Sequence, residues 1–432
     1  MLFGTTPADV PFPIVGRRIA RSAQQLADGR FRRRLGISTG RAPRGHLRHW
    51  LLGAVLLATR VCDALLDPWI GRWIDARFAR GALAVWQPAA WAALLMALGF
   101  AALWQPLRTD AGAVVMNLAL ASVLTFVAYS VVSVTHQAWG ARWGGDEGAR
   151  ARIVAWREGA ALVGVVMAGA LPAWAGPSAL PWALALTLAL GVALLRTTAS
   201  QERPSPSTTL QAPARTTYSP SPSPSPSPWA SPAFRRLLAV FMLNGVASAI
   251  PATLLPFFVA DRLQLPGQTA TCLMVYFLAA GLGLSVWVRA IRRWGLVPCW
   301  LTGMGLSIAA FIGVLALGAG DLHAFLLICA TSGLALGVDL VAPAALLAGI
   351  VPRQGEHGQD GGYFGWWACA NKLNAALAVG LALPMLSALG YAEGSRDADA
   401  LWALTLAYGA WPCAFKLAAA VCLWRSRHHL TA

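Results

Sequence analysis

The chain has 432 residues, of which 57% are hydrophobic and 12% are charged, and its mean hydropathy is +0.56. A soluble domain carries roughly twice this share of charged residues, so the composition excludes an ordinary soluble protein and indicates a polytopic membrane protein made of helices. The formal net charge of +16 does not indicate nucleic-acid binding, because the arginines lie in short loops between apolar runs, as the positive-inside rule expects.

About eleven apolar runs are long enough to cross a bilayer core of roughly 30 Å. In chain order we expect membrane-spanning helices at residues 50–70, 82–104, 112–138, 153–175, 180–196, 237–259, 270–290, 298–318, 322–350, 366–390 and 400–424. The loops between them alternate in charge, and we expect the arginine-rich set to be cytoplasmic. That set includes the long polar segment after the fifth run and the residues after the last run. Both this linker and the C-terminus should therefore be cytoplasmic.

The polar segment at residues 197–233 divides the apolar runs into two groups. Its Ser-Pro repeats cannot build a core and favour extended polyproline conformations, so they predict a linker. We expect an N-terminal helical bundle at residues 50–196 and a C-terminal helical bundle at residues 234–432. Two halves around a site near the membrane midplane are a common plan of secondary transporters.

Residues 1–49 form a basic tail with ten arginines and no apolar run that could span a membrane. The start of the first run is expected outside, so a basic tail before it violates the positive-inside rule. Three explanations stay open. The first is that the tail is translated from the wrong reading frame, since a GC-rich gene read out of frame gives a sequence rich in Arg, Pro and Gly. Otherwise the chain is a truncated or degenerate transporter, or the tail is a genuine cytoplasmic extension.

Two aspartates, Asp63 and Asp67, lie one helical turn apart inside the first apolar run. An ionised carboxylate in a bilayer costs roughly 2.5–3.5 kcal/mol on insertion scales, so we expect both to point into a bundle. The spacing puts them on one helix face, where they are a candidate site for a cation. Lys372 could neutralise them. A bound cation would compete with Lys372, or a proton could occupy one carboxylate, since two neighbouring carboxylates resist ionising together. A static salt bridge between the two bundles is the alternative.

The motifs around this pair resemble a known family. Gly71-x-x-x-Asp75-x-Arg77-x-x-Arg80 resembles the loop signature of the major facilitator superfamily. Arg60-x-x-Asp63-Ala64-x-x-Asp67-Pro68 is similar to the glycoside–pentoside–hexuronide:cation symporters, the melibiose-permease type. The further matching stretches are Trp156-Arg157-Glu158-Gly159, Asn244-Gly245-Val246-Ala247-Ser248-Ala249-Ile250-Pro251-Ala252-Thr253, Gly337-Val338-Asp339-Leu340 and Gly362-Tyr363-Phe364-Gly365. The resemblance therefore covers about residues 50–425. It implies an all-α, two-bundle fold with twelve spans, of which the first is missing or mistranslated here.

The resemblance also implies roles for single residues. Asp63, Asp67 and Ser130 would bind the coupling Na⁺ or H⁺, with Lys372 as the charge partner of the two carboxylates. Arg157 would contact the sugar. Ser133 stands near the position of a sugar-binding aspartate of melibiose permease, which makes melibiose itself a doubtful substrate. The gating and loop motif would consist of Gly71, Asp75, Arg77, Arg80 and Asp339.

Five polar or aromatic residues in or beside the apolar runs call for an interpretation of their own. Trp366 is a candidate for stacking on a sugar. Arg157 and Glu158 are adjacent, so we expect them to face different ways on their helix. We interpret Lys416 as a snorkelling or structural lysine, and His136 as an interfacial histidine rather than a proton relay.

We therefore expect a secondary active transporter that carries a glycoside or related sugar with Na⁺ or H⁺ across a bacterial inner membrane by alternating access. Its partners would be this small molecule, the cation and the lipid bilayer. We expect no resident cofactor and no enzymatic activity, since the sequence has no zinc-ligand spacing, nucleophile motif or phosphate loop. Two alternatives remain: transport of a lipid, drug or other amphiphile on the same fold, and a degenerate protein that transports nothing.

Overall fold

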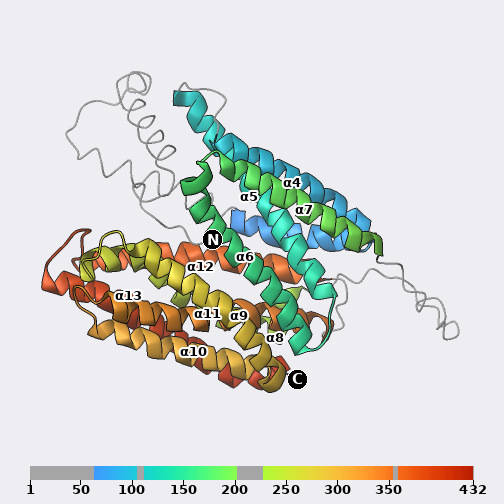
Figure 1. The fold of residues 1–432 in the computed structure, drawn as a ribbon. Coiled ribbons are helices and arrows are strands. Elements are labelled where there is room, and N and C mark those ends of the chain that lie inside the picture. Colours follow the sequence, from blue (N-terminus) through green and yellow to red (C-terminus); the bar gives the residue numbers. More distant parts are fainter. Residues whose placement is uncertain (1–62, 105–110, 202–226, 354–358, 432) are drawn as a thin grey trace, which may run out of the picture.

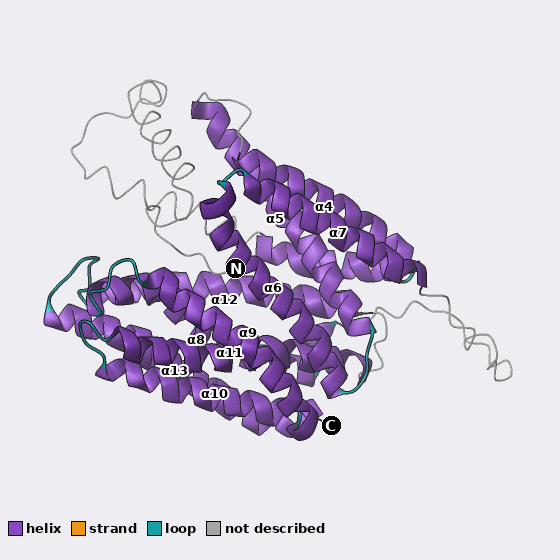
Figure 2. Cartoon of the chain, in the orientation of Figure 1, coloured by secondary structure: helices purple, strands orange, loops and turns teal. Residues whose placement is uncertain are grey.

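The computed structural model describes residues 63–104, 111–201, 227–353 and 359–431 (Figure 1). Throughout this described part the regular elements are helices, with no strand among them (Figure 2). The predicted all-α membrane fold is therefore confirmed. Long apolar segments form helices in a bilayer because a helix satisfies all of its backbone hydrogen bonds internally.

The helices fall into an N half and a C half. The N half contains the helical residues 63–78 (helix 63–78), α4 (Ala82–Trp104), α5 (Ala111–Arg142), α6 (Glu147–Ala175) and α7 (Ala179–Gln201). The C half begins with the short η2 (Pro228–Ala230) and α8 (Pro232–Phe257), which continues as a π-helix, η3 (Phe258–Arg262). It goes on with α9 (Thr269–Trp294), α10 (Leu296–Ile312), η4 (Gly313–Ala316), α11 (Leu322–Arg353), α12 (Asp360–Ala388) and α13 (Ala398–Thr431).

Ten helices in the described ranges are long and apolar enough to cross a membrane. They coincide with the second to eleventh runs expected from the sequence. Helix 63–78 continues the first expected run, whose start lies outside the described residues. The expected basic tail and most of the expected Ser/Pro-rich linker also fall on residues that the structure does not describe, so the expectation about a first span lies outside the described residues.

The two halves pack against each other through a few helices. α5 contacts α12, and α6 contacts both α9 and α11. In Figure 1, α6 runs from the N half toward the C half. One hydrophobic cluster joins the halves and includes Trp139 of α5, Phe234 of α8 and Val341 of α11. A second cluster, which includes Phe258, Phe325 and Tyr408, lies within the C half. The halves are therefore held together mainly through the first cluster.

Glycines bring helix 63–78 and α12 into backbone contact. A Cβ atom on Gly71 would lie 2.0 Å from the carbonyl oxygen of Gly361, and one on Gly365 would lie 2.5 Å from the carbonyl oxygen of Asp67. No larger residue fits at either place without moving the backbone. This close crossing positions the aspartates of the N half against the lysine of the C half.

Candidate ion and substrate site

Three charged side chains meet where helix 63–78 crosses α12. Lys372 Nζ lies 2.9 Å from Asp63 Oδ2 and 2.8 Å from Asp67 Oδ1. The side chains of Lys372 and Asp63 are each 7% exposed, and that of Asp67 is fully buried. The structure thus brings together residues that are about three hundred positions apart in the sequence. We call this group, with Ser130, the ion cluster.

Ser130 of α5 completes the ion cluster. Lys372 Nζ donates a hydrogen bond to Ser130 Oγ at 2.7 Å, and Ser130 Oγ lies 3.3 Å from Asp63 Oδ1. All four residues expected to couple the cation are therefore within contact of one another. Their oxygens are the hard ligands that alkali and alkaline-earth cations prefer.

The charges of the ion cluster do not balance. Two carboxylates face one ammonium group, so the group carries one net negative charge when all three side chains are ionised. One oxygen, Asp67 Oδ2, is buried without a hydrogen-bond partner among the described residues. A buried, uncompensated charge is costly in a low-dielectric interior. One additional proton or monovalent cation would balance the charge, and Asp67 Oδ2 is the free acceptor for it.

The expected substrate residues Arg157 and Ser133 lie near one another on α6 and α5. Tyr129 of α5 is within hydrogen-bonding reach of Ser133, and it interacts electrostatically with Arg157, Glu158 and Asp67. Ser133 Oγ also accepts a hydrogen bond from Gln137 Nε2 at 3.0 Å. We call Tyr129, Ser133, Gln137, Arg157 and Glu158 the polar wall; it adjoins the ion cluster.

Arg157 and Glu158 pair with each other, although the sequence analysis expected them to face different ways. Arg157 Nη2 and Nε lie 2.8 Å and 3.0 Å from Glu158 Oε1. Their side chains are 21% and 22% exposed. The expectation is wrong. Adjacent residues leave a helix in different directions, but these two long side chains bend toward each other. The pair leaves the polar wall without net charge.

Trp366 is not brought to the polar wall. Its ring contacts that of Trp229 edge to face, with ring centroids 4.9 Å apart. Trp366 precedes Lys372 by six residues on α12, which is about 9 Å along a helix axis. Trp229 belongs to η2, just before α8, so this aromatic contact lies near the ends of α8 and α12 that face the arginine-rich loops.

The loop motif closes the arginine-rich side of the molecule. Asp75 Oδ1 and Oδ2 accept hydrogen bonds of 2.7 Å from the amides of Gly361 and Gly362, at the start of α12. These amides have no partner within their own helix, and the N-terminus of a helix favours a negative charge. Burial raises the pKa of Asp75 to about 7, while the two amide hydrogen bonds act in the opposite direction. Arg77 of the motif lies over the ring of Trp73, and Arg80 is exposed.

Two further contacts close the same side, and no sequence motif indicates them. Arg142 Nε lies 3.2 Å from Asp360 Oδ2. Glu147 Oε2 accepts a hydrogen bond of 2.9 Å from the amide of Leu296, at the start of α10. Both contacts join the N half to the C half. Their partners are a helix N-terminus and an acidic first turn, which sequence spacing alone cannot pair.

Asp339 is not part of the loop motif. It lies in the middle of α11, where Lys416 Nζ of α13 is 2.6 Å from Asp339 Oδ2 and Trp300 Nε1 of α10 donates to Asp339 Oδ1 at 2.9 Å. Lys416 also approaches Ser248 Oγ of α8 at 3.5 Å. Both charged side chains are only 6% exposed, so Lys416 does not snorkel. We call Asp339 and Lys416 the C-half pair.

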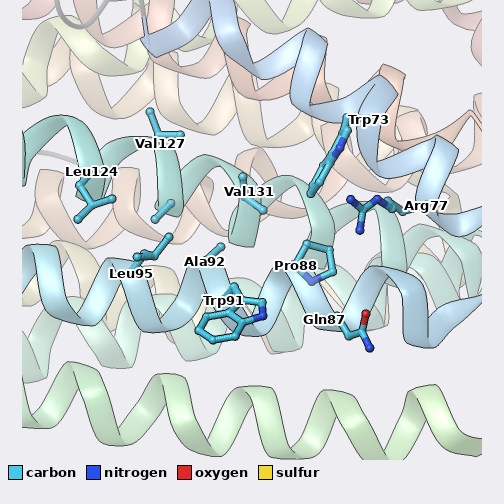
Figure 3. A pocket seen from close by; sticks show the side chains of 11 residues that line it. Trp73, Arg77, Gln87, Pro88, Trp91, Ala92, Leu95, Leu124, Val127 and Val131 are labelled. Carbon is cyan, nitrogen blue, oxygen red and sulfur yellow. The ribbon is translucent and has the colours of Figure 1, made fainter.

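A cavity of about 410 Å³ lies between helix 63–78, α4 and α5 (Figure 3). Its lining is mainly apolar and includes Trp73, Arg77 and Trp91, as the close view shows. It contains neither the ion cluster nor the polar wall. In the described part of the chain no group of three or more His, Cys, Asp or Glu residues is arranged to hold a metal ion. The ion cluster and polar wall are thus the candidate site.

A family model described as "MFS/sugar transport protein" matches residues 46–428. Among curated proteins, none matches the chain. Of the solved structures, a bacterial homologue of the iron transporter ferroportin in the outward-facing state is similar with a TM-score of 0.62 at 17% identity, covering 96% of this chain and 98% of that chain. The human organic anion transporter MFSD10 has a TM-score of 0.57 at 17% identity, with 95% and 90% covered. The fucose:proton symporter of E. coli has a TM-score of 0.52 at 15% identity, with 94% of each chain covered.

Proposed function

We propose that this chain, which belongs to the MFS/sugar transport protein family, moves a glycoside or related sugar across a membrane together with Na⁺ or H⁺. The family and the fold make it a membrane transporter of the major facilitator type. The sugar and the coupling cation go beyond what the family and the fold establish, and they are the proposed part. The melibiose-permease-type membership, the bacterial inner membrane and the cytoplasmic linker and C-terminus belong to the same proposal.

The unbalanced charge of the ion cluster carries the proposal. The cluster needs one more positive charge, and it lies where the two halves touch. A cation or proton arriving at Asp67 weakens the hold of Lys372 on the carboxylates, because both compete for the same oxygens. Lys372 belongs to α12 and the carboxylates belong to helix 63–78. Ion occupancy therefore changes how strongly the two halves attract each other.

The contacts on the arginine-rich side support alternating access. Asp75, Arg142 and Glu147 of the N half each contact the start of a C-half helix there. We take this side as the cytoplasmic one and the structure as a state closed to the cytoplasm. In the opposite state these contacts separate and the binding site opens to the cytoplasm.

The polar wall favours an uncharged, hydroxylated substrate. It offers the hydroxyl of Tyr129, the hydroxyl of Ser133 and the amide of Gln137, which both donate and accept hydrogen bonds. Its one cationic group, Arg157, is paired with Glu158. An organic anion would need an unpaired cation there, so the neutral wall supports a sugar rather than an anion or an anionic lipid.

Uptake into proteoliposomes tests the proposal. The purified full chain is reconstituted, a Na⁺ or a proton gradient is imposed, and uptake of labelled galactose, melibiose, xylose and glucose is measured. We expect at least one sugar to accumulate against its gradient only when the cation gradient is present. The Asp67→Asn variant should lose this accumulation while it remains in the membrane.

The matched control is Asp399→Asn, the same change at an exposed residue in the first turn of α13. It should accumulate sugar like the unmodified chain. Intact cation-driven accumulation in Asp67→Asn would contradict the assigned role of the ion cluster. If none of the four sugars enters while a lysophospholipid is carried, the amphiphile alternative replaces the sugar.

A further inference from the structure

Two buried asparagines with unsatisfied amides belong to α8 and α12, two helices that pack against each other. Asn244 of α8 and Asn374 of α12 are each 4% exposed. Asn244 Oδ1, Asn374 Oδ1 and Asn374 Nδ2 have no hydrogen-bond partner among the described residues. No residue with an assigned role accounts for them. Like Asp67 Oδ2, these three amide atoms are buried polar atoms without a partner in the described part of the chain.

Such atoms are expensive inside a membrane protein. An amide that loses water and gains no partner loses the free energy of its hydrogen bonds, and lipid cannot replace them. Even if the two side chains turned toward each other, one hydrogen bond would use only one donor and one acceptor. The unpaired set contains both acceptors and a donor. Its natural complement is a group that donates and accepts at once, and a hydroxyl is the smallest such group.

The backbone leaves space for the Asn374 amide. A Cβ atom on Gly245, the residue after Asn244, would lie 1.9 Å from Asn374 Nδ2. The missing side chain of Gly245 therefore permits the amide to lie against α8. Ser248 follows Asn244 by one helical turn, so the same face of α8 continues as a polar stripe toward the C-half pair.

The asparagines are close to the ion cluster along the chain. Asn374 follows Lys372 by two residues, about 3 Å along the axis of α12. Lys372 contacts the N half while Asn374 lies against α8 of the C half. A ligand held by Asn374 is thus bound by the same helix segment that carries the charge partner of Asp67.

We propose that Asn244 and Asn374 form a hydroxyl-binding subsite in the C half. The hydroxyl comes from the transported sugar or from a bound water molecule. The sugar source rests on the proposed function, whereas the water source does not. With a sugar hydroxyl bound, α12 carries ligands for both substrates: Lys372 at the ion cluster and Asn374 at the sugar.

The test combines sugar affinity with thermal unfolding of the purified full chain in detergent. Galactose and melibiose are the probes, and their affinities are taken from the concentration dependence of the midpoint temperature. The variants are Asn244→Leu, Asn374→Leu, the double variant and Gly245→Ala. Gly245→Ala keeps the amide but displaces it, so it removes the site without removing the asparagine. Asn371→Leu, the same substitution at an exposed residue of α12, is the matched control.

If the sugar supplies the hydroxyl, Asn374→Leu and Gly245→Ala weaken sugar binding by about tenfold, the value of one good hydrogen bond, and Asn371→Leu does not. If water supplies it, sugar affinity stays unchanged. Each single Asn→Leu change then lowers the midpoint without sugar, and the double variant lowers it no further, because one water bridges both amides. Both results support the subsite.

Unchanged sugar affinity together with an unchanged, raised or additively lowered midpoint overturns the subsite. An unchanged or raised midpoint means that apolar groups replace the amides without loss, as expected for polar atoms that bind nothing. An additively lowered midpoint means that the two amides act independently and share no bound hydroxyl. If the unmodified chain binds neither sugar, the sugar assignment in the proposed function fails by itself. The midpoints without sugar still decide whether the amides hold a hydroxyl.

Discussion

The chain buries two aspartate–lysine groups, and they differ in charge balance and in what they connect. The ion cluster has two carboxylates and one ammonium group, and it joins the N half to the C half. The C-half pair has one of each, stays within the C half, and uses its other carboxylate oxygen to accept from Trp300. A balanced, fully bonded pair has no need of an ion. The ion cluster is unbalanced and lies where the halves meet, so it does need an ion. The same residue types therefore serve as an anchor in the C-half pair and as an ion site in the ion cluster.

The largest expected effect comes from breaking the C-half pair. Lys416→Met leaves Asp339 buried without its cation, which should lower the free energy of unfolding by about 3–5 kcal/mol. The double change Asp339→Leu/Lys416→Met should recover most of this loss, because it removes both charges. Denaturant unfolding in detergent measures both values. A Lys416→Met variant as stable as the unmodified chain would mean that the pair is not an anchor.

Changing one carboxylate of the ion cluster should have the opposite sign. Asp67→Asn leaves one carboxylate and one ammonium group, which is the charge balance of the C-half pair. We expect stability without Na⁺ to be unchanged or to rise by about 1–2 kcal/mol. We also expect the stabilisation by added Na⁺ or protons to vanish. Midpoint temperatures at several NaCl concentrations and pH values test this. A strongly destabilised variant would show that the cluster is a static salt bridge.

Another effect concerns the pH dependence of closure at Asp75. In the closed state its pKa is about 7, while a carboxyl exposed by opening returns toward its ordinary 3.8. The closed state therefore binds the proton more tightly, so closure should strengthen as the pH falls through about 7 toward 4. Hydrogen exchange of the Gly361 and Gly362 amides, corrected for the intrinsic rate, measures this. Asp75→Asn should abolish the dependence. Weaker protection of the two amides at low pH in the unmodified chain would contradict the expected direction.

The smallest effect is expected at Glu147. Glu147→Gln keeps an oxygen that accepts from the Leu296 amide but removes the charge at the start of α10. The loss should be about 0.3–1 kcal/mol, seen as faster hydrogen exchange at the start of α10. Glu393→Gln, at an exposed residue of the loop before α13, is the control and should change nothing there. If the two variants show the same hydrogen exchange at the start of α10, Glu147 does not contribute to closure.

How much of the site could be predicted depended on the kind of signal. Asp63, Asp67 and Lys372 stand out because charged residues in apolar runs are costly, and they do meet. Asp75 was found through its loop motif, but its partners are backbone amides, which have no signature in a sequence. Asp339 and Lys416 were each noticed, yet their pairing depends on how α11 and α13 pack across 77 positions.

Other features were missed for related physical reasons. The pairing of Arg157 with Glu158 depends on side-chain flexibility rather than on helical direction. Asn244 lies in a stretch that resembles the family, but the missing partners of its amide and of the Asn374 amide become visible only in the tertiary packing. The number and order of the helices, in contrast, follow from the length and polarity of the apolar runs. The ten membrane-crossing helices of the described residues match ten of the eleven expected runs.

The central claim is that the ion cluster holds one exchangeable positive charge. Calorimetric titration of the purified chain with NaCl measures Na⁺ binding, and acid–base titration of the chain, compared with that of Asp67→Asn, measures proton exchange at the cluster. The account predicts that each unmodified chain binds one Na⁺ or exchanges one proton, and that Asp67→Asn does neither. If the unmodified chain shows no ion heat and no proton exchange, or if Asp67→Asn retains them, the cluster is not the coupling site.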